Sequence, residues 1–221
     1  MMSSNVRMGM LACVMAMVLL GGCQAERNLD LVREVGNREY QLGEYDKALA
    51  NYQEYVTRKP DGVDVRYSLA ETYLKLNKPQ EAREQFYQCL AVHPDNQAYA
   101  QGLAEALYAC NEREELITFL TREARERGRP GDYERLGHYQ LLLGNVDEAK
   151  LALITAAKLD GGKSIKPQME LANLYRSLGD KQSELKRLRM ALYIEPKNPE
   201  IQKRIRELGE IPGPSFVLQP D

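Results

Sequence analysis

Apolar residues between positions 63 and 96 recur at helical spacing in two successive runs. The first run is Leu69, Ala70, Tyr73 and Leu74, and the second is Ala82, Phe86, Cys89 and Leu90. Pro79 stands between the two runs. Because proline lacks an N–H and has a preset φ, it ends one helix and is tolerated at the first position of the next. The pattern predicts two amphipathic helices joined by a tight turn.

This helical hairpin recurs along the chain. Neither helix can bury its apolar face alone, so a unit of this kind needs neighbours of the same kind. A small residue followed by a helical run occurs five times, at intervals of 34, 34, 33 and 35 residues, as Gly36, Ala70, Ala104, Gly137 and Ala172. A turn residue recurs in step as Gly43, Asn77, Asn111, Gly144 and Gly179. The sequence therefore predicts five helical hairpins in phase.

Two further positions share the period. The small residue of the second helix recurs as Ala48, Ala82 and Ala149, and a closing proline recurs as Pro60, Pro94 and Pro196. This arrangement of small, aromatic and proline residues resembles the tetratricopeptide repeat over about residues 29–198. The second repeat matches nearly throughout. The departures in later repeats are Leu116 and Glu123 at small positions, Gly161 at the closing proline and Glu184 at an alanine.

The resemblance implies an all-α fold, a helix-turn-helix repeat solenoid of about five units followed by a C-terminal capping helix. The expected repeats cover residues 29–62, 63–96, 97–129, 130–164 and 165–198. Residues 199–209 carry Ile201, Ile205 and Leu208 on one helical face, as expected of a helix that covers the apolar end of an array.

The last residues, 210–221, are rich in proline, and we expect a flexible tail there. The tail also carries the apolar cluster Phe216, Val217 and Leu218, which a purely solvated segment would not need. The alternative is that the tail docks into a groove of its own molecule or of a neighbour.

The N-terminal residues have the features of an export signal. Arg7 precedes an apolar run of 13 residues, Met8–Leu20, which is too short to span a bilayer with ordinary flanks. Leu20-Gly21-Gly22-Cys23 resembles the bacterial lipobox, in which the cysteine receives the lipid. We therefore expect a lipoprotein signal peptide over residues 1–22 and a lipidated tether over residues 23–28. The alternative is an ordinary signal peptide that happens to contain a cysteine.

Lipidation at Cys23 would place the chain in a bacterial cell envelope. Covalent acyl chains each contribute about 0.8 kcal/mol per buried CH₂, so two or more anchor a protein stably. Gln24, rather than aspartate, follows the cysteine, and the enterobacterial sorting pattern then favours the outer membrane. The expected location is the periplasmic face of that membrane.

Composition and residue spacing give no support for catalysis. The 30 basic and 32 acidic residues leave a formal charge of −2 at pH 7, which makes no electrostatic case for binding nucleic acid. His93 and His138 have no companions at metal-ligand spacing, and no Ser/His/Asp or Cys/His arrangement is evident. We therefore expect no catalytic residues, metal, cofactor or small-molecule substrate.

Binding remains as the expected activity. In the family that the chain resembles, the first helix of each repeat lines a concave groove. Carried over residue by residue, the groove positions are Arg33, Asn37, Tyr40, Tyr67, Glu71, Leu74, Gln101, Glu105, Tyr108, Glu134, His138, Leu141, Met169, Asn173 and Arg176. Tyrosines suit peptide recognition because they combine an apolar body with a polar tip. The alternative is that these residues are simply exposed helix positions.

Lipobox and repeats together indicate a non-catalytic, membrane-anchored scaffold for another envelope protein or an extended peptide segment. Similar lipoproteins help to assemble pili, secretion channels or outer-membrane complexes. A second hypothesis is an adaptor that recruits or regulates a cell-wall hydrolase or synthase through a helix surface instead of the groove.

Overall fold

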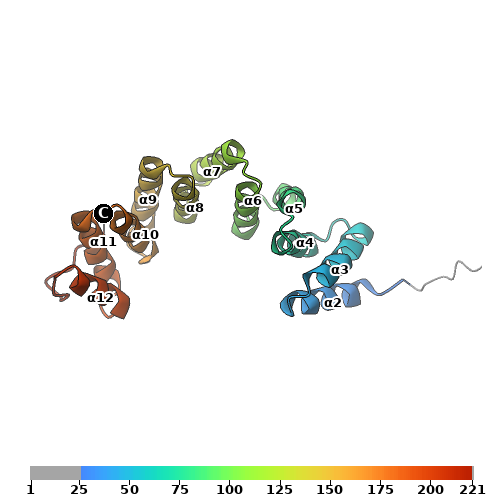
Figure 1. The fold of residues 1–221 in the computed structure, drawn as a ribbon, viewed down its shortest axis with the longest axis horizontal. Helices are drawn as coiled ribbons and strands as arrows, with labels where there is room; N and C mark the ends of the chain where they lie inside the picture. The colour runs from blue at the N-terminus through green and yellow to red at the C-terminus, as the bar shows by residue number, and fades with distance from the viewer. Residues whose placement is uncertain (1–25, 221) are drawn as a thin grey trace, which may run out of the picture. The chain divides into compact units, whose positions relative to one another are not determined.

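The computed structural model describes residues 26–220, and over this range it contains eleven α-helices and no strand (Figure 1). Ten of the helices form five consecutive hairpins. The first helices of the hairpins are α2 (Leu29–Gln41), α4 (Val63–Lys75), α6 (Gln97–Ala109), α8 (Pro130–Leu142) and α10 (Lys166–Ser177). The second helices are α3 (Tyr45–Arg58), α5 (Pro79–Val92), α7 (Arg113–Arg127), α9 (Val146–Asp160) and α11 (Lys181–Ile194). A final helix, α12 (Pro199–Glu207), follows. The predicted all-α fold of repeated helical hairpins is confirmed.

The turn inside each hairpin depends on one residue with left-handed backbone geometry. The turn residues named from the sequence all have a positive φ, between 55° and 82°: Gly43, Asn77, Asn111, Gly144 and Gly179. In each turn the next residue closes a Schellman-type hydrogen bond, as when Asn145 N donates to Gln140 O at 2.9 Å. Glycine and asparagine tolerate this conformation best, which explains why only these two types occupy the position.

The small residue of each first helix lets the second helix approach closely. The five positions predicted from the period, Gly36, Ala70, Ala104, Gly137 and Ala172, are all buried. A Cβ atom on Gly137 would lie only 2.7 Å from Leu153 Cγ, so nothing larger than hydrogen fits at that crossing. The closest helix contacts therefore occur where the sequence has its smallest side chains.

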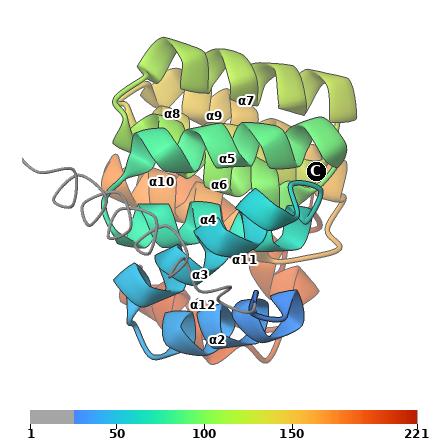
Figure 2. The ribbon, with the colours of Figure 1, turned by 90° about the vertical axis from the view of Figure 1, so that its right-hand side faces the viewer.

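The chain divides into two compact units at Thr72. The first unit has Val32, Ala48 and Tyr52 in its core. In the second unit, each helix from α5 to α12 packs on the next along the chain. The second helices α5 and α7 run nearly parallel (Figure 2).

A buried ion pair joins α11 to the capping helix α12. Glu184 and Arg204 lie 2.7 Å apart, and their side chains are only 5% and 7% exposed. Arg204 also donates to Asn173 Oδ1 on α10 at 2.7 Å. Glu184 occupies the position where the repeat pattern has alanine. A carboxylate can be buried there because Arg204 of α12 packs against it and forms the ion pair.

Of the two possibilities stated for the C-terminal tail, a flexible segment or one docked on its own molecule, the structure has the docked arrangement. Arg189 on α11 donates to the carbonyl oxygen of Phe216 at 2.7 Å, so the tail returns along that helix. Phe216 and Val217 pack against the apolar core of the last hairpin. The physical reason is the apolar cluster noted in the sequence, which gains by leaving water.

The N-terminal predictions fall largely outside the described residues. The signal peptide of residues 1–22, Cys23 and the first residues of the tether lie there, and they stay predictions. Between residues 26 and 220, no helix combines the length and apolar character needed to cross a membrane.

We expect Glu184→Ala to lower the free energy of unfolding by about 3–5 kcal/mol, because it leaves the Arg204 guanidinium buried without its carboxylate. Urea denaturation followed by circular dichroism measures the loss. The exposed, neighbouring Gln182→Ala is the matched control. The double variant Glu184→Ala/Arg204→Met should recover most of the stability, and equal stability of Glu184→Ala and the wild type would contradict the assignment.

Candidate functional site

All fifteen groove residues named from the sequence lie on the first helices of their hairpins, but their exposure differs. Those exposed are Asn37, Gln101, Glu105, Tyr108, His138, Asn173 and Arg176. Those half-buried are Arg33, Tyr40, Tyr67, Glu71, Leu74, Leu141 and Met169. Glu134 is buried, so it is part of the protein's own packing as well as of a surface.

In the first unit, the groove residues of α2 already have partners within the unit. Asn37 Oδ1 accepts a hydrogen bond from the Tyr52 hydroxyl at 2.8 Å. A guanidinium nitrogen of Arg33 lies 3.3 Å from the Asp30 carboxylate. These contacts hold the side chains in place on the helix surface.

In the second unit, two pockets adjoin each other among α6, α8, α9 and α10. The leucine pocket, of about 250 Å³, is lined by His138, Leu141, Leu153, Glu170, Asn173, Leu174 and Ser177. The ionic pocket, of about 270 Å³, is lined by Gln97, Gln101, Gly131, Glu134, Arg135, His138, Lys166 and Glu170. His138 and Glu170 line both pockets, so the two pockets are adjacent and together make up the candidate site.

The site gathers five of the predicted groove residues, namely Gln101, Glu134, His138, Leu141 and Asn173. Glu134 and His138 are four residues apart on α8, which places them on one helix face. The other predicted residues of α6 and α10, which are Glu105, Tyr108, Met169 and Arg176, do not line either pocket.

The charged side chains of the ionic pocket are fixed by one another. Glu134 forms an ion pair with Lys166 of the next hairpin. Arg135 donates to Gln101 Oε1 at 3.1 Å and to the buried Asp132 carboxylate at 3.3 Å. A site whose side chains are already held by neighbours loses little conformational entropy when a ligand binds.

Glu170 is the least satisfied charged group of the site. Its Oε2 atom is buried and has no hydrogen-bond partner among the residues that the structure describes. Burial raises the pKa of the Glu170 carboxyl, and the nearby Glu134 carboxylate raises it further, while Lys166 opposes the shift. Lys166 Nζ lies 3.9 Å from Oε1, too far for a hydrogen bond. A ligand that donates a hydrogen bond here would stabilise the carboxylate.

Two tyrosines lie next to the site. The rings of Tyr108 and Tyr139 are 5.7 Å apart, and Gln101 donates to the Tyr139 hydroxyl at 3.4 Å. Burial, followed by the charge of Glu105, raises the pKa of Tyr139 to about 12. Tyr139 therefore keeps its proton at neutral pH and serves as a hydrogen-bonding group.

Sequence reasoning missed several lining residues, namely Gln97, Arg135, Lys166, Glu170 and Leu174. Glu170 directly follows the predicted Met169, and Arg135 directly follows the predicted Glu134. These residues could not be identified from their helix positions. The groove positions were carried over from a repeat pattern, and such a pattern does not show which side chains of the next hairpin extend into the site.

The described part of the chain contains no set of side chains arranged to bind a metal ion. Over residues 26–220, no group of three or more histidine, cysteine, aspartate or glutamate side chains lies close enough to hold an ion.

A family model of the tetratricopeptide repeat matches residues 35–91 and 67–112, so the chain carries tetratricopeptide repeats in that part. No curated protein matches the chain.

Solved structures, among them two described as tetratricopeptide repeat proteins, extend the likeness of fold over most of the chain. The crystal structure of TTC0263 from Thermus thermophilus is 25% identical, covers 82% of this chain and 98% of its own, and has a TM-score of 0.55. MamA from Desulfovibrio magneticus is 17% identical, with 77% and 97% covered and a TM-score of 0.58. YrrB, described as a tetratricopeptide repeat protein with an unusual peptide-binding site, is 17% identical, with 80% and 90% covered and a TM-score of 0.51. At these identities the likeness to MamA and YrrB concerns the fold.

We expect Glu170→Gln to raise the free energy of unfolding at pH 7 and to have less effect near pH 4.5. Because the folded-state pKa of Glu170 is raised, its contribution to stability is complete below its ordinary value of 4.5 and is lost as the pH rises through the folded-state value. Urea denaturation at the two pH values tests this. Glu105→Gln, on the exposed surface of α6, controls for loss of a surface charge. A Glu170→Gln effect that does not change with pH would contradict the prediction.

Proposed function

We propose that this protein is a non-catalytic, membrane-anchored scaffold that binds an extended segment of another envelope protein. The observation that carries the proposal is that the leucine pocket and the ionic pocket are adjacent and share His138 and Glu170. An extended segment alternates its side chains, so it can place an apolar side chain in one pocket and a polar one in the next.

The composition of the site favours a peptide over a small apolar ligand. Leu141, Leu153 and Leu174 supply apolar walls. The amide nitrogen of Asn173, whose Oδ1 already accepts from Arg204, can donate to a peptide backbone, and the Glu170 carboxylate can accept from one. The related fold of YrrB, which is described as having a peptide-binding site, supports this class of ligand. A scaffold role also accounts for the charges of the ionic pocket, which are paired with one another.

Membrane anchoring is the second part of the proposal, and it rests on the lipobox that ends at Cys23. The repeats begin close behind it, since Asn28 caps α2 by accepting a hydrogen bond from Asp30 N at 2.7 Å. Even fully extended, residues 24–28 reach only about 20 Å. The first repeat would therefore stay near the membrane surface, where it could help to assemble a pilus, a secretion channel or an outer-membrane complex.

Site-specific photocrosslinking in the native host tests the binding site. With a photoreactive phenylalanine analogue at the exposed His138, we expect one main adduct with an envelope protein, because an occupant of either pocket touches this residue. The same analogue at Leu151, which is 65% exposed on α9 and outside both pockets, is the matched control. Gel shift and mass spectrometry identify the adduct.

The opposite pattern of crosslinks would favour the adaptor hypothesis over binding in the pockets. An adduct at Leu151 and none at His138 would mean that a partner, such as a cell-wall hydrolase or synthase, binds a helix surface, and the pockets would lose their proposed role. Adducts at neither position would contradict both binding modes at these residues.

The anchor is tested separately by Cys23→Ser. We expect the wild-type chain in the membrane fraction of lysed cells and the variant in the soluble fraction, because serine cannot accept the lipid through a thioether. Metabolic labelling with a palmitate analogue should mark the wild type alone. Soluble wild-type protein without label would show that the lipobox interpretation is wrong, and would leave the peptide-binding proposal standing.

A further inference from the structure

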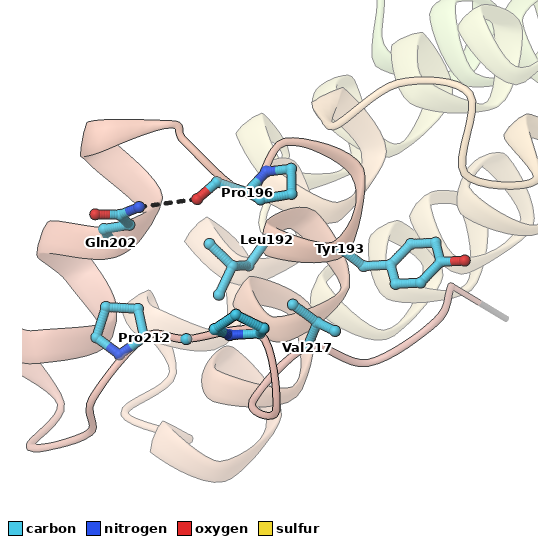
Figure 3. A pocket seen from close by; sticks show the side chains of 8 residues that line it. Leu192, Tyr193, Pro196, Gln202, Pro212 and Val217 are labelled. Carbon is cyan, nitrogen blue, oxygen red and sulfur yellow. Dashed lines mark hydrogen bonds between the residues drawn. The ribbon is translucent and has the colours of Figure 1, made fainter.

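The C-terminal tail runs along α11 in the direction opposite to the helix. Pro212 and Pro214 lie with Leu192 and Pro196 around one pocket, and further on Leu218 N donates to Arg189 O at 3.2 Å. Figure 3 shows Pro212 and Val217 facing Leu192 of α11. The tail ends against the loop between α9 and α10, where a Cβ on Gly162 would lie 3.0 Å from Pro220 Cγ.

The central contact of the tail is made with Arg189. Its guanidinium carbon lies 4.9 Å from the centre of the Phe216 ring, a cation–π geometry, and its Nε donates to the Phe216 carbonyl oxygen at 2.7 Å. Phe216 and Val217 pack on the core that includes Leu188 and Leu192. Recognition thus combines a backbone hydrogen bond, an aromatic ring and an aliphatic side chain.

The tail lies on the same apolar core as the capping helix. Ile201 and Ile205 of α12 are fully buried in that core, and Phe216 and Val217 pack against its edge. Phe216 and Val217 are only half-buried. The tail is a short segment with one hydrogen-bonded turn, in which Phe216 N donates to Gly213 O at 2.9 Å, and it lies on α11 as a peptide lies on a receptor.

The surface beneath the tail has room for more than the tail supplies. The pocket bounded by Leu192, Tyr193, Pro196 and the tail residue Val217 has a volume of about 460 Å³. Tyr193 remains 48% exposed at its edge. An occupant with a larger apolar side chain in place of Val217 would bury more apolar area and bind more tightly.

We propose that the face of α11 and α12 under the tail is a second protein-binding site, for a proline-flanked segment of a partner that forms a turn and carries an aromatic–aliphatic pair. In the structure this site is occupied by residues 210–220 of the same chain. Prolines suit such a ligand, because their preset φ restricts the free segment before binding and lowers the entropy cost of ordering it. This site does not depend on the pockets of α6, α8 and α10.

A peptide-exchange experiment on the full-length chain tests the proposal. The site is vacated by Phe216→Ala/Val217→Ala, and a fluorescent peptide with the wild-type sequence of residues 210–220 is titrated in. We expect saturable binding by anisotropy, and binding to the wild-type chain that is weaker by about tenfold or more, because a tethered tail competes at an effective concentration on the order of millimolar.

Matched variants establish where the peptide binds. Adding Arg189→Ala to the vacated chain should weaken binding by about tenfold, since it removes a ring contact and a charge-assisted hydrogen bond. The control is Arg122→Ala, which removes a similar arginine stacked 5.9 Å from Phe119 on α7, away from the tail. A peptide with alanine in place of Phe216 should bind no better than background.

Two results would overturn the proposal. Equal binding of the peptide to vacated and wild-type chains, or to neither, would make the tail a structural cover only. Concentration-dependent dimers of the wild type that the double substitution abolishes would make a second copy the occupant and refute occupation in cis. Should the double variant unfold, Phe216→Leu keeps an apolar side chain but loses the ring contact, and it is expected to give intermediate peptide affinity.

Discussion

The structure depends on the close crossing of two helices at one small residue per hairpin. At Gly137 the gap leaves no room even for a methyl group, and the left-handed residue of the following turn directs the second helix into that crossing. Because a single hairpin cannot bury both its faces, each of these crossings is stable only when a further helix covers it. The small residue, the left-handed turn residue and the repetition of the hairpin are therefore all needed for the same result, which is the burial of each helix crossing.

This requirement leaves polar side chains of the first helices beside the core, and in the second unit these, together with the buried Leu153 and Leu174, form the candidate site. Its charges are arranged around neighbours: Arg135 is held by Asp132 and Gln101, and Lys166 by Glu134. Glu170 stands apart, since one of its carboxylate oxygens is buried without a donor among the described residues. The Glu170 carboxylate is thus held in place beside the apolar walls of the leucine pocket. Little side-chain entropy is lost when a ligand binds there.

The period, the small residues and the turn residues could be predicted from the sequence, because they follow from local geometry that repeats every hairpin. The same reasoning placed five of the lining residues of the site. It missed Glu170 and Lys166, whose importance comes from contacts between successive hairpins, and it assigned Glu134 to a surface when that side chain is buried. It left open whether the tail is flexible or docks on its own molecule, because proline content says nothing about whether Phe216 finds a partner such as Arg189.

The ion pair between Glu184 and Arg204 has a consequence for the length of the array. Where earlier hairpins have an alanine or another residue that packs without charge, the last one presents a buried carboxylate that only a suitably placed arginine neutralises. A further hairpin of the usual pattern, or the end of another molecule, would leave that charge unpaired if it took the place of α12. The Glu184 carboxylate therefore disfavours the stacking of a further hairpin, or of a second molecule, in the place of α12.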